Sequence, residues 1–203
     1  MIDPWNELER IPASMAEAVK PHLAATTLAG YQRFLSAMVH YTRGSGERLR
    51  HAAARVKEPE LQAFFDRLAR EEAGHYRLAE SDLAAFGLAV VGETPDEVTA
   101  FHRAWMESED PATWLGALYA LESVGGHLGD DAAKNLARLG LGRDHVRFVM
   151  VHLEADTEHG AATAEHVRRN LHAGGERMIA SARAAATFWI GLHVRAFTGD
   201  VSP

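Results

Sequence analysis

The sequence predicts an all-α protein, and three observations lead to that prediction. Apolar residues recur at steps of three and four along several segments, which is the spacing of one helix face. No segment shows a sustained alternation of apolar and polar residues, and no Asn-Gly pair marks a hairpin. Prolines at the starts of these segments and glycines at their ends supply the boundaries that helices need.

Prolines, capping residues and glycines mark the boundaries of the expected helices. Pro59, Pro95 and Pro111 each fit the first turn of a helix, with Thr94 and Asp110 as caps before two of them. Glycines mark the ends and turns between segments. The helices expected from these signals span residues 13–24, 27–55, 59–86, 95–108, 111–138, 143–172 and 176–197.

Length and composition favour a single domain. The chain has 203 residues, 47% of them apolar and 24% charged, which suits a globular protein with a sizeable core. We therefore expect one bundle of about seven helices over residues 1–203, with loose termini at 1–12 and 198–203.

Charge and hydropathy limit the partners and the location. The formal charge is −7 without any basic run, so neither nucleic acid nor an anionic membrane is expected as a partner. No apolar stretch approaches the ~18 residues of a membrane span. The first residues lack the pattern of a signal peptide, so a cytoplasmic location is expected.

The chain contains no cysteine and twelve histidines. The first fact excludes disulfides, a thiolate nucleophile, an iron–sulfur cluster and a cysteine-ligated zinc site. The second directs attention to where the histidines lie.

Polar residues interrupt the apolar face of segment 59–86. That face is formed by Leu61, Phe65, Leu68, Glu72, His75, Ala79, Leu83 and Phe86. Glu72 and His75 are therefore expected to point inward, while neighbouring charged residues such as Glu71 lie off the face and are expected to be solvated.

A second inward face, on segment 143–172, shows the same anomaly. It is formed by Val149, His152, Asp156, His159 and Thr163. Helical geometry places Asp156 ~40° and His159 ~20° from His152 around the axis, so the three point in one direction. On segment 111–138, Glu122 shares a face with Leu115 and is the third inward acid.

Buried carboxylates cost several kcal/mol unless a cation or strong donors compensate them. Mixed carboxylate and imidazole ligands suit iron or manganese better than calcium, and Glu-x-x-His on a helix is typical of di-iron sites in helical bundles. The sequence therefore predicts an iron site, with two Fe(II) ions, whose ligands are Glu72, His75, Glu122, His152, Asp156 and His159.

Alternative interpretations of these residues stay open. A slight rotation of the helix would turn Glu72 and His75 to the surface, and the second inward face could be a solvated one. Glu122 could hydrogen-bond backbone at a bend among neighbouring glycines. Whether His40 or His193 joins the site is left open.

Several stretches together carry a family resemblance. They are residues 71–75 (EEAGH), residues 82–87 (DLAAFG), the acid Glu122 and the pattern His152-x-x-x-Asp156-x-x-His159. Over roughly residues 27–197 the chain resembles the haem-oxygenase-like di-iron oxidases and oxygenases, often labelled iron-containing redox enzymes.

The resemblance implies a haem-oxygenase-like fold, usually a homodimer, with a non-haem iron pair and no catalytic residue beyond its ligands. By that resemblance the ligands divide into Glu72, His75 and His159 for one iron, and Glu122, His152 and Asp156 for the other. The implied activity is the oxidation by dioxygen of a small metabolite such as an amino acid, a fatty acid or a natural-product intermediate.

Other families share parts of the pattern. Residues 116–126 also resemble the distal helix of haem oxygenases, but only His22 is placed to serve as their axial ligand and its surroundings match poorly. A ferritin-like di-iron protein would need Glu47 as its first ligand, and Glu47 lies off the inward face. The thiamine-salvage enzymes of this fold use a cysteine that is absent here, and a non-catalytic interaction module would leave the acids solvated.

Overall fold

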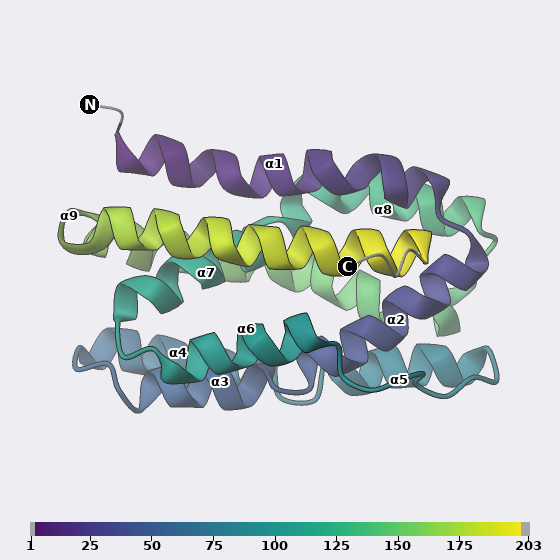
Figure 1. Cartoon of the computed structure of the whole chain (residues 1–203), viewed down its shortest axis with the longest axis horizontal. Coiled ribbons are helices and arrows are strands. Elements are labelled where there is room, and N and C mark those ends of the chain that lie inside the picture. The colour runs from purple at the N-terminus through teal and green to yellow at the C-terminus, as the bar shows by residue number, and fades with distance from the viewer. Residues whose placement is uncertain (1–2, 200–203) are drawn as a thin grey trace.

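The computed structural model describes residues 3–199, and helix is their main conformation (Figure 1). The described helices, in chain order, are α1 (Pro4–Ala25), α2 (Leu28–Thr42), α3 (Ser45–Ala53), α4 (Pro59–Glu71), α5 (Tyr76–Ala85), α6 (Asp96–Glu107), α7 (Pro111–Ser123), α8 (Gly125–Arg138), the 3-10 turn η1 (Arg143–His145) and α9 (Arg147–Thr198). No strand occurs within residues 3–199. The predicted all-α class is confirmed.

Helix α1 begins nine residues before its predicted start. Asp3 caps it by accepting a hydrogen bond from the backbone N–H of Trp5 at 3.0 Å, and Pro4 occupies the first turn. Leu8 and Ile11 are buried, so residues 4–12 are a packed helix and not a loose terminus. Of the expected loose ends, residues 1–2 and 200–203 lie outside the described part of the chain.

Three of the predicted helices are each divided in two. The segment 27–55 breaks at Arg43 and Gly44, and the segment 111–138 breaks at Val124. The segment 59–86 breaks over residues 72–75, where Gly74 adopts a φ of +100° that a helix cannot accommodate. The apolar face continues across this last break, which is why the sequence pattern did not show it.

Of the two predicted caps, one is confirmed. Asp110 accepts a hydrogen bond from the backbone N–H of Ala112 at 3.1 Å and starts α7. Thr94 does not cap α6, because Pro95 is itself the residue before the helix and offers no side-chain acceptor. The Thr94 hydroxyl instead lies 3.2 Å from Nδ1 of His40.

Helix α9 doubles back on itself. Helical conformation runs from Arg147 to Thr198, yet Phe34 packs against both Phe148 and Phe197, with ring centroids at 6.1 and 5.3 Å. A straight helix would place those two residues ~70 Å apart. Figure 1 shows the reversal at one end of the molecule, and Gly174 lies near the middle of the helix. The two antiparallel halves correspond to the two helices predicted from the sequence.

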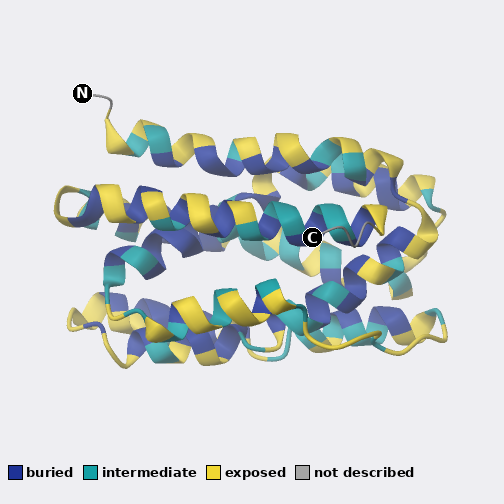
Figure 2. Ribbon diagram, in the orientation of Figure 1, coloured by how far each residue is buried: buried dark blue, intermediate teal, exposed yellow. Residues whose placement is uncertain are grey.

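The halves of α9 lie at the centre of the arrangement. Helix α7 and helix α1 pack against α9, α8 packs against α1, and α3 packs against α4. Figure 1 shows α1 and α8 along one side of the molecule and α3, α4 and α6 along the other. Buried faces turn inward on each helix (Figure 2). Within residues 3–199, no helix combines the length and the hydropathy of a membrane span.

Candidate metal centre

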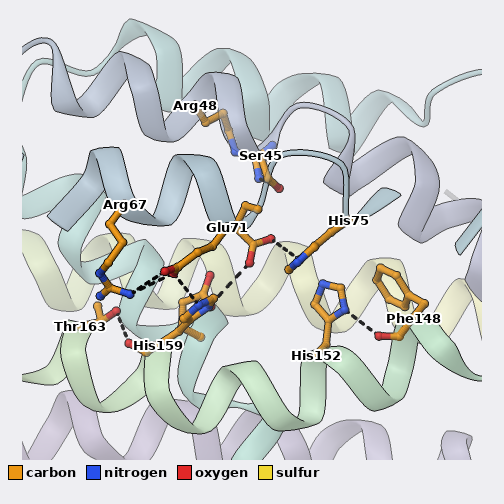
Figure 3. A network of polar contacts seen from close by, with 11 residues as sticks. Ser45, Arg48, Arg67, Glu71, His75, Phe148, His152, His159 and Thr163 are labelled. Carbon is orange, nitrogen blue, oxygen red and sulfur yellow. Dashed lines mark hydrogen bonds and ion pairs between the residues drawn. The ribbon is translucent and has the colours of Figure 1, made fainter. Parts of the chain in front are cut away.

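Acidic and histidine side chains from three segments meet in the interior (Figure 3). Glu72 directly follows α4, and His75 directly precedes α5 across the break. Glu122 lies in the last turn of α7, while His152 and His159 come from the first half of α9. The inward direction predicted for these residues therefore agrees with their positions in the structure.

One group of potential ligands joins the helix break to the start of α9. Nδ1 of His75 lies 3.1 Å from Oε2 of Glu72, and the rings of His75 and His152 have centroids 4.9 Å apart. One ligand atom from each of Glu72, His75 and His152 lies within 4.8 Å of the others. That spacing suits three ligands of a single ion.

A second group shares Glu72 with the first. Nδ1 of His159 lies 3.1 Å from Oε2 of Glu122 and 3.6 Å from Oε1 of Glu72. Ligand atoms of these three residues also lie within 4.8 Å of one another. Glu72 therefore stands between the two groups, with one carboxylate oxygen near each, as a bridging carboxylate would.

This grouping differs from the division that the family resemblance implied. His152 lies with Glu72 and His75, and His159 lies with Glu72 and Glu122. Asp156 belongs to neither group. Its carboxylate accepts a hydrogen bond from the backbone of Gly125, at the first residue of α8, where a Cβ would come within 2.1 Å of Oδ2.

Glu71 also reaches the cluster, although the periodic pattern of the sequence places it off the inward face. Although its side chain is partly exposed, Oε2 lies 3.1 Å from Nε2 of His159 and 2.9 Å from Nη1 of Arg67. The expectation that Glu71 is merely solvated is wrong, because the break after α4 lets adjacent residues reach the same histidine. The one signal in the sequence was the pairing of Arg67 with Glu71 at a spacing of four residues.

The backbone fixes the orientation of His152. Its Nδ1 donates a hydrogen bond to the carbonyl oxygen of Phe148 at 2.7 Å, which leaves Nε2 unprotonated in the neutral ring. Nε2 is buried and has no hydrogen-bond partner among residues 3–199. The start of α9 is held in turn by Asp82, which accepts from the backbone N–H of Phe148 at 2.8 Å.

Mutual repulsion and burial act on the acids of the cluster. Burial and the neighbouring Glu72 raise the pKa of Glu122, while burial followed by the charges of Glu122 and Glu72 raises the pKa of Asp156 well above its ordinary value. Burial also opposes ionisation of Glu72, but the adjacent histidines outweigh it and lower the pKa of Glu72. Burial lowers the pKa of His152.

The donor set fits a divalent transition metal. A carboxylate whose pKa is raised by burial and by a neighbouring acid is stabilised in its charged form by a cation, and an unpartnered imidazole nitrogen is the atom that a metal would take. Oxygen and nitrogen ligands without sulfur suit iron or manganese. The residues present therefore fit the iron pair that the sequence predicted.

A cavity of ≈ 160 Å³ adjoins the cluster. Glu72, Glu122, His152 and Asp156 line it, together with mainly apolar side chains. His193 also lines the cavity, with its ring stacked on Trp189 at a centroid distance of 3.7 Å.

The sequence left open whether His40 and His193 belong to the site, and the structure places these two residues apart from each other. Burial lowers the pKa of His193 to about 4, so this residue is a neutral part of the cavity wall. His40 instead contacts the segment before α6, where Nε2 lies 3.4 Å from the carbonyl oxygen of Val91. Neither residue belongs to the two ligand groups.

Fold and cluster together define a helical protein with an internal carboxylate and histidine centre, and sequence comparison gives its family. The chain belongs to the iron-containing redox enzyme family, whose sequence model matches residues 32–190. The family resemblance noted in the sequence is thereby confirmed. No curated protein sequence matches the chain.

Solved structures agree on the fold. The chain is similar to a domain of unknown function with a haem oxygenase-like fold from Shewanella denitrificans, at 18% identity and a TM-score of 0.81, over 96% of this chain and 90% of that one. It is also similar to a TenA homologue from P. horikoshii (15% identity, TM-score 0.77, 97% of each chain) and to one from Pyrococcus furiosus (13%, 0.74, 96% and 98%). At these identities the likeness shows the haem oxygenase-like fold alone.

Proposed function

We propose that this protein is a non-haem di-iron oxidase or oxygenase that binds two Fe(II) ions and uses dioxygen to oxidise a small metabolite held in the adjoining cavity. The observation that carries the proposal is the pair of ligand groups that share Glu72. A homodimer and a cytoplasmic location stay predictions from the sequence.

The proposed ligands follow the geometry. His75 and His152 would hold one ion with Glu72, and Glu122 and His159 would hold the other with the second oxygen of Glu72. Asp156 is proposed as the sixth ligand, and it would have to turn from Gly125 to take that role. Ferrous iron would supply the reduction of dioxygen, a reaction that no side chain carries out alone.

The chain's own residues orient the ligands and exclude water. The carbonyl oxygen of Phe148 holds the His152 ring with Nε2 free. Glu71, itself paired with Arg67, lies against Nε2 of His159 on the side opposite Glu122, which fixes the ring as carboxylates do behind metal-bound histidines. The buried position of the cluster keeps bulk solvent from the reacting groups.

The surroundings weigh against the haem oxygenase alternative. Two of the glycines in the stretch that resembles a distal haem helix lie against protein: a Cβ on Gly116 would meet the backbone of Met178 at 2.1 Å, and one on Gly125 would meet Asp156. A cavity of ≈ 160 Å³ is comparable with an apolar protein cavity that binds benzene, a molecule much smaller than a haem. Gly116 and Gly125 therefore support close packing between segments of the chain.

Anaerobic reconstitution with Fe(II) tests the proposal. Gel-filtered protein is expected to retain two iron ions per chain, to show no Soret band when incubated with haem, and to oxidise its iron on exposure to air. Uptake of stoichiometric haem with a Soret band would favour the haem oxygenase alternative. Protein that retains neither iron nor haem would favour a non-catalytic interaction module.

A further inference from the structure

Arg48 is a buried residue in the wall of the cavity. It lies on α3, its residue is 6% exposed, and its side chain lines the same cavity as Glu72 and Glu122. Buried arginines are rare unless they are paired, because removing a guanidinium from water costs several kcal/mol. The partners of this side chain therefore decide what it can do.

The contacts of the guanidinium are all with neutral groups. Nη1 donates to the carbonyl oxygen of Tyr41 at 3.4 Å and contacts Nε2 of His102, and Nη2 donates to the hydroxyl of Ser45 at 3.0 Å. The guanidinium carbon Cζ lies 5.2 to 5.9 Å from the ring centroids of Tyr41, Phe101 and Trp105. Burial, followed by the charge of Arg48, lowers the pKa of His102 to about 4, so that ring is neutral.

No carboxylate balances this charge at close range. Among the ion pairs formed by residues 3–199, none involves Arg48. The acids Glu72 and Glu122 act on it only over a longer distance. Two ferrous ions in the proposed centre would take up the negative charge of those acids and leave Arg48 uncompensated.

Nε2 of His102 donates its own hydrogen to the carbonyl oxygen of Tyr41 at 3.1 Å, so it cannot accept one from Arg48. Three of the five guanidinium N–H groups, the one on Nε and one on each Nη, therefore have no acceptor in the described part of the chain. Two N–H groups are what arginine offers to the two oxygens of a carboxylate. Tyr41, Ser45 and Trp105 also line the cavity, so the guanidinium stands at its wall.

The rest of the cavity is mainly apolar, although Thr26 and Asn135 also line it. Val19 and Leu23 of α1 and Leu136 of α8 line it, and these helices lie on the side of the molecule away from α3 (Figure 1). A volume of ≈ 160 Å³ is comparable with that of an apolar protein cavity that binds benzene, so the space suits a small organic molecule. The cavity thus joins one cationic group to an apolar space, with the acids and histidines between them.

We propose that Arg48 binds the carboxylate of the substrate, and that the substrate is a small carboxylic acid whose apolar chain occupies the space lined by α1 and α8. This inference rests on the proposed function, because iron in the centre is what leaves Arg48 free to pair with an anion. The carboxylate belongs either to a simple aliphatic acid or to an apolar α-amino acid.

Calorimetric titration of the Fe(II)-loaded protein under anaerobic conditions tests this assignment. The probes are octanoate, 1-octanol, octylamine and leucine. The variant is Arg48→Gln, and the matched control is Arg50→Gln, which makes the same change at an exposed site on the same helix. The iron content and the melting temperature of each protein are measured alongside.

The expected result is selective for charge. Octanoate or leucine binds the unaltered protein and Arg50→Gln equally and binds Arg48→Gln about 10- to 100-fold more weakly, as expected for a charge-assisted hydrogen bond. Binding of 1-octanol is the same in all three proteins. Whichever of octanoate and leucine shows the Arg48 dependence identifies the kind of carboxylic acid. Should Arg48→Gln fail to fold, Arg48→Lys keeps the charge and is expected to show a smaller loss.

Two results would overturn the inference in distinguishable ways. Iron-loaded Arg48→Gln that binds every probe as the unaltered protein does, or an unaltered protein that binds neither carboxylate, contradicts the role of Arg48 and leaves the iron centre standing. An unaltered protein that takes up no iron contradicts the proposed function, and this inference with it.

Discussion

The two segments that supply most of the cluster are built differently. On α9, His152, Asp156 and His159 lie on an uninterrupted stretch of helix, so helical geometry alone determines their directions. Between α4 and α5, Glu72 and His75 flank a break in which Gly74 has a positive φ. The helix fixes the spacing of its ligands, whereas the break lets adjacent residues, Glu71 and Glu72, both reach His159.

The largest expected effect comes from the shared acid at the break. Glu72→Gln removes the carboxylate that stands in both ligand groups, so iron content should fall from two ions per chain to near zero. Anaerobic reconstitution followed by metal analysis measures this. The control Glu60→Gln, an exposed acid in the first turn of α4, should keep both ions. Retention of one ion by Glu72→Gln would show that Glu72 does not bridge.

The histidines of α9 should each affect one ion. Because His152 and His159 belong to different groups, His152→Ala and His159→Ala should each retain one iron, and the double variant none. Helicity by circular dichroism should be unchanged, and His172→Ala, at an exposed site on α9, serves as the control. Loss of both ions in either single variant would mean that the two ions bind only together.

The break itself should tolerate little change. Gly74→Ala forces a Cβ into a left-handed conformation and should lower the free energy of unfolding by about 1–2 kcal/mol, although nothing lies within 4 Å of the added atom. Gly126→Ala, in open space on helical backbone, should instead raise it by about 0.5–1 kcal/mol. Urea titration of both variants gives the comparison. Equal effects of the two changes would show that the conformation at Gly74 is not required.

The smallest expected effect concerns Glu71. Glu71→Gln keeps a group of the same shape but removes the charge against Nε2 of His159, and iron affinity at that site should fall about 10-fold. Competition with a chelator measures the affinity, with Glu60→Gln again as the reference. An unchanged affinity would mean that Glu71 serves only its surface pair with Arg67.

The sequence predicted the helical class and the direction of the polar residues because both follow from a periodic pattern. Leu68, Glu72 and Ala79 are buried as their spacing required. The sequence also predicted that the chain reverses within the segment that forms α9, because Gly174 and Gly175 mark a helix end there.

The sequence pattern could not predict features that depend on contacts between residues distant in the chain. The break after α4 keeps the apolar face in register, so the pattern conceals it. Asp156 faces Gly125 because α8 begins there, and helix geometry contains no such information. The burial of Arg48 likewise depends on how α6 packs beside α3.

Anomalous diffraction at the iron edge, from crystals grown anaerobically with Fe(II), tests the central claim most directly. The predicted result is two iron peaks, each within bonding distance of a different carboxylate oxygen of Glu72, with His152 on one ion and His159 on the other. A single peak that excludes Glu72, or iron only at the protein surface, would contradict the di-iron centre.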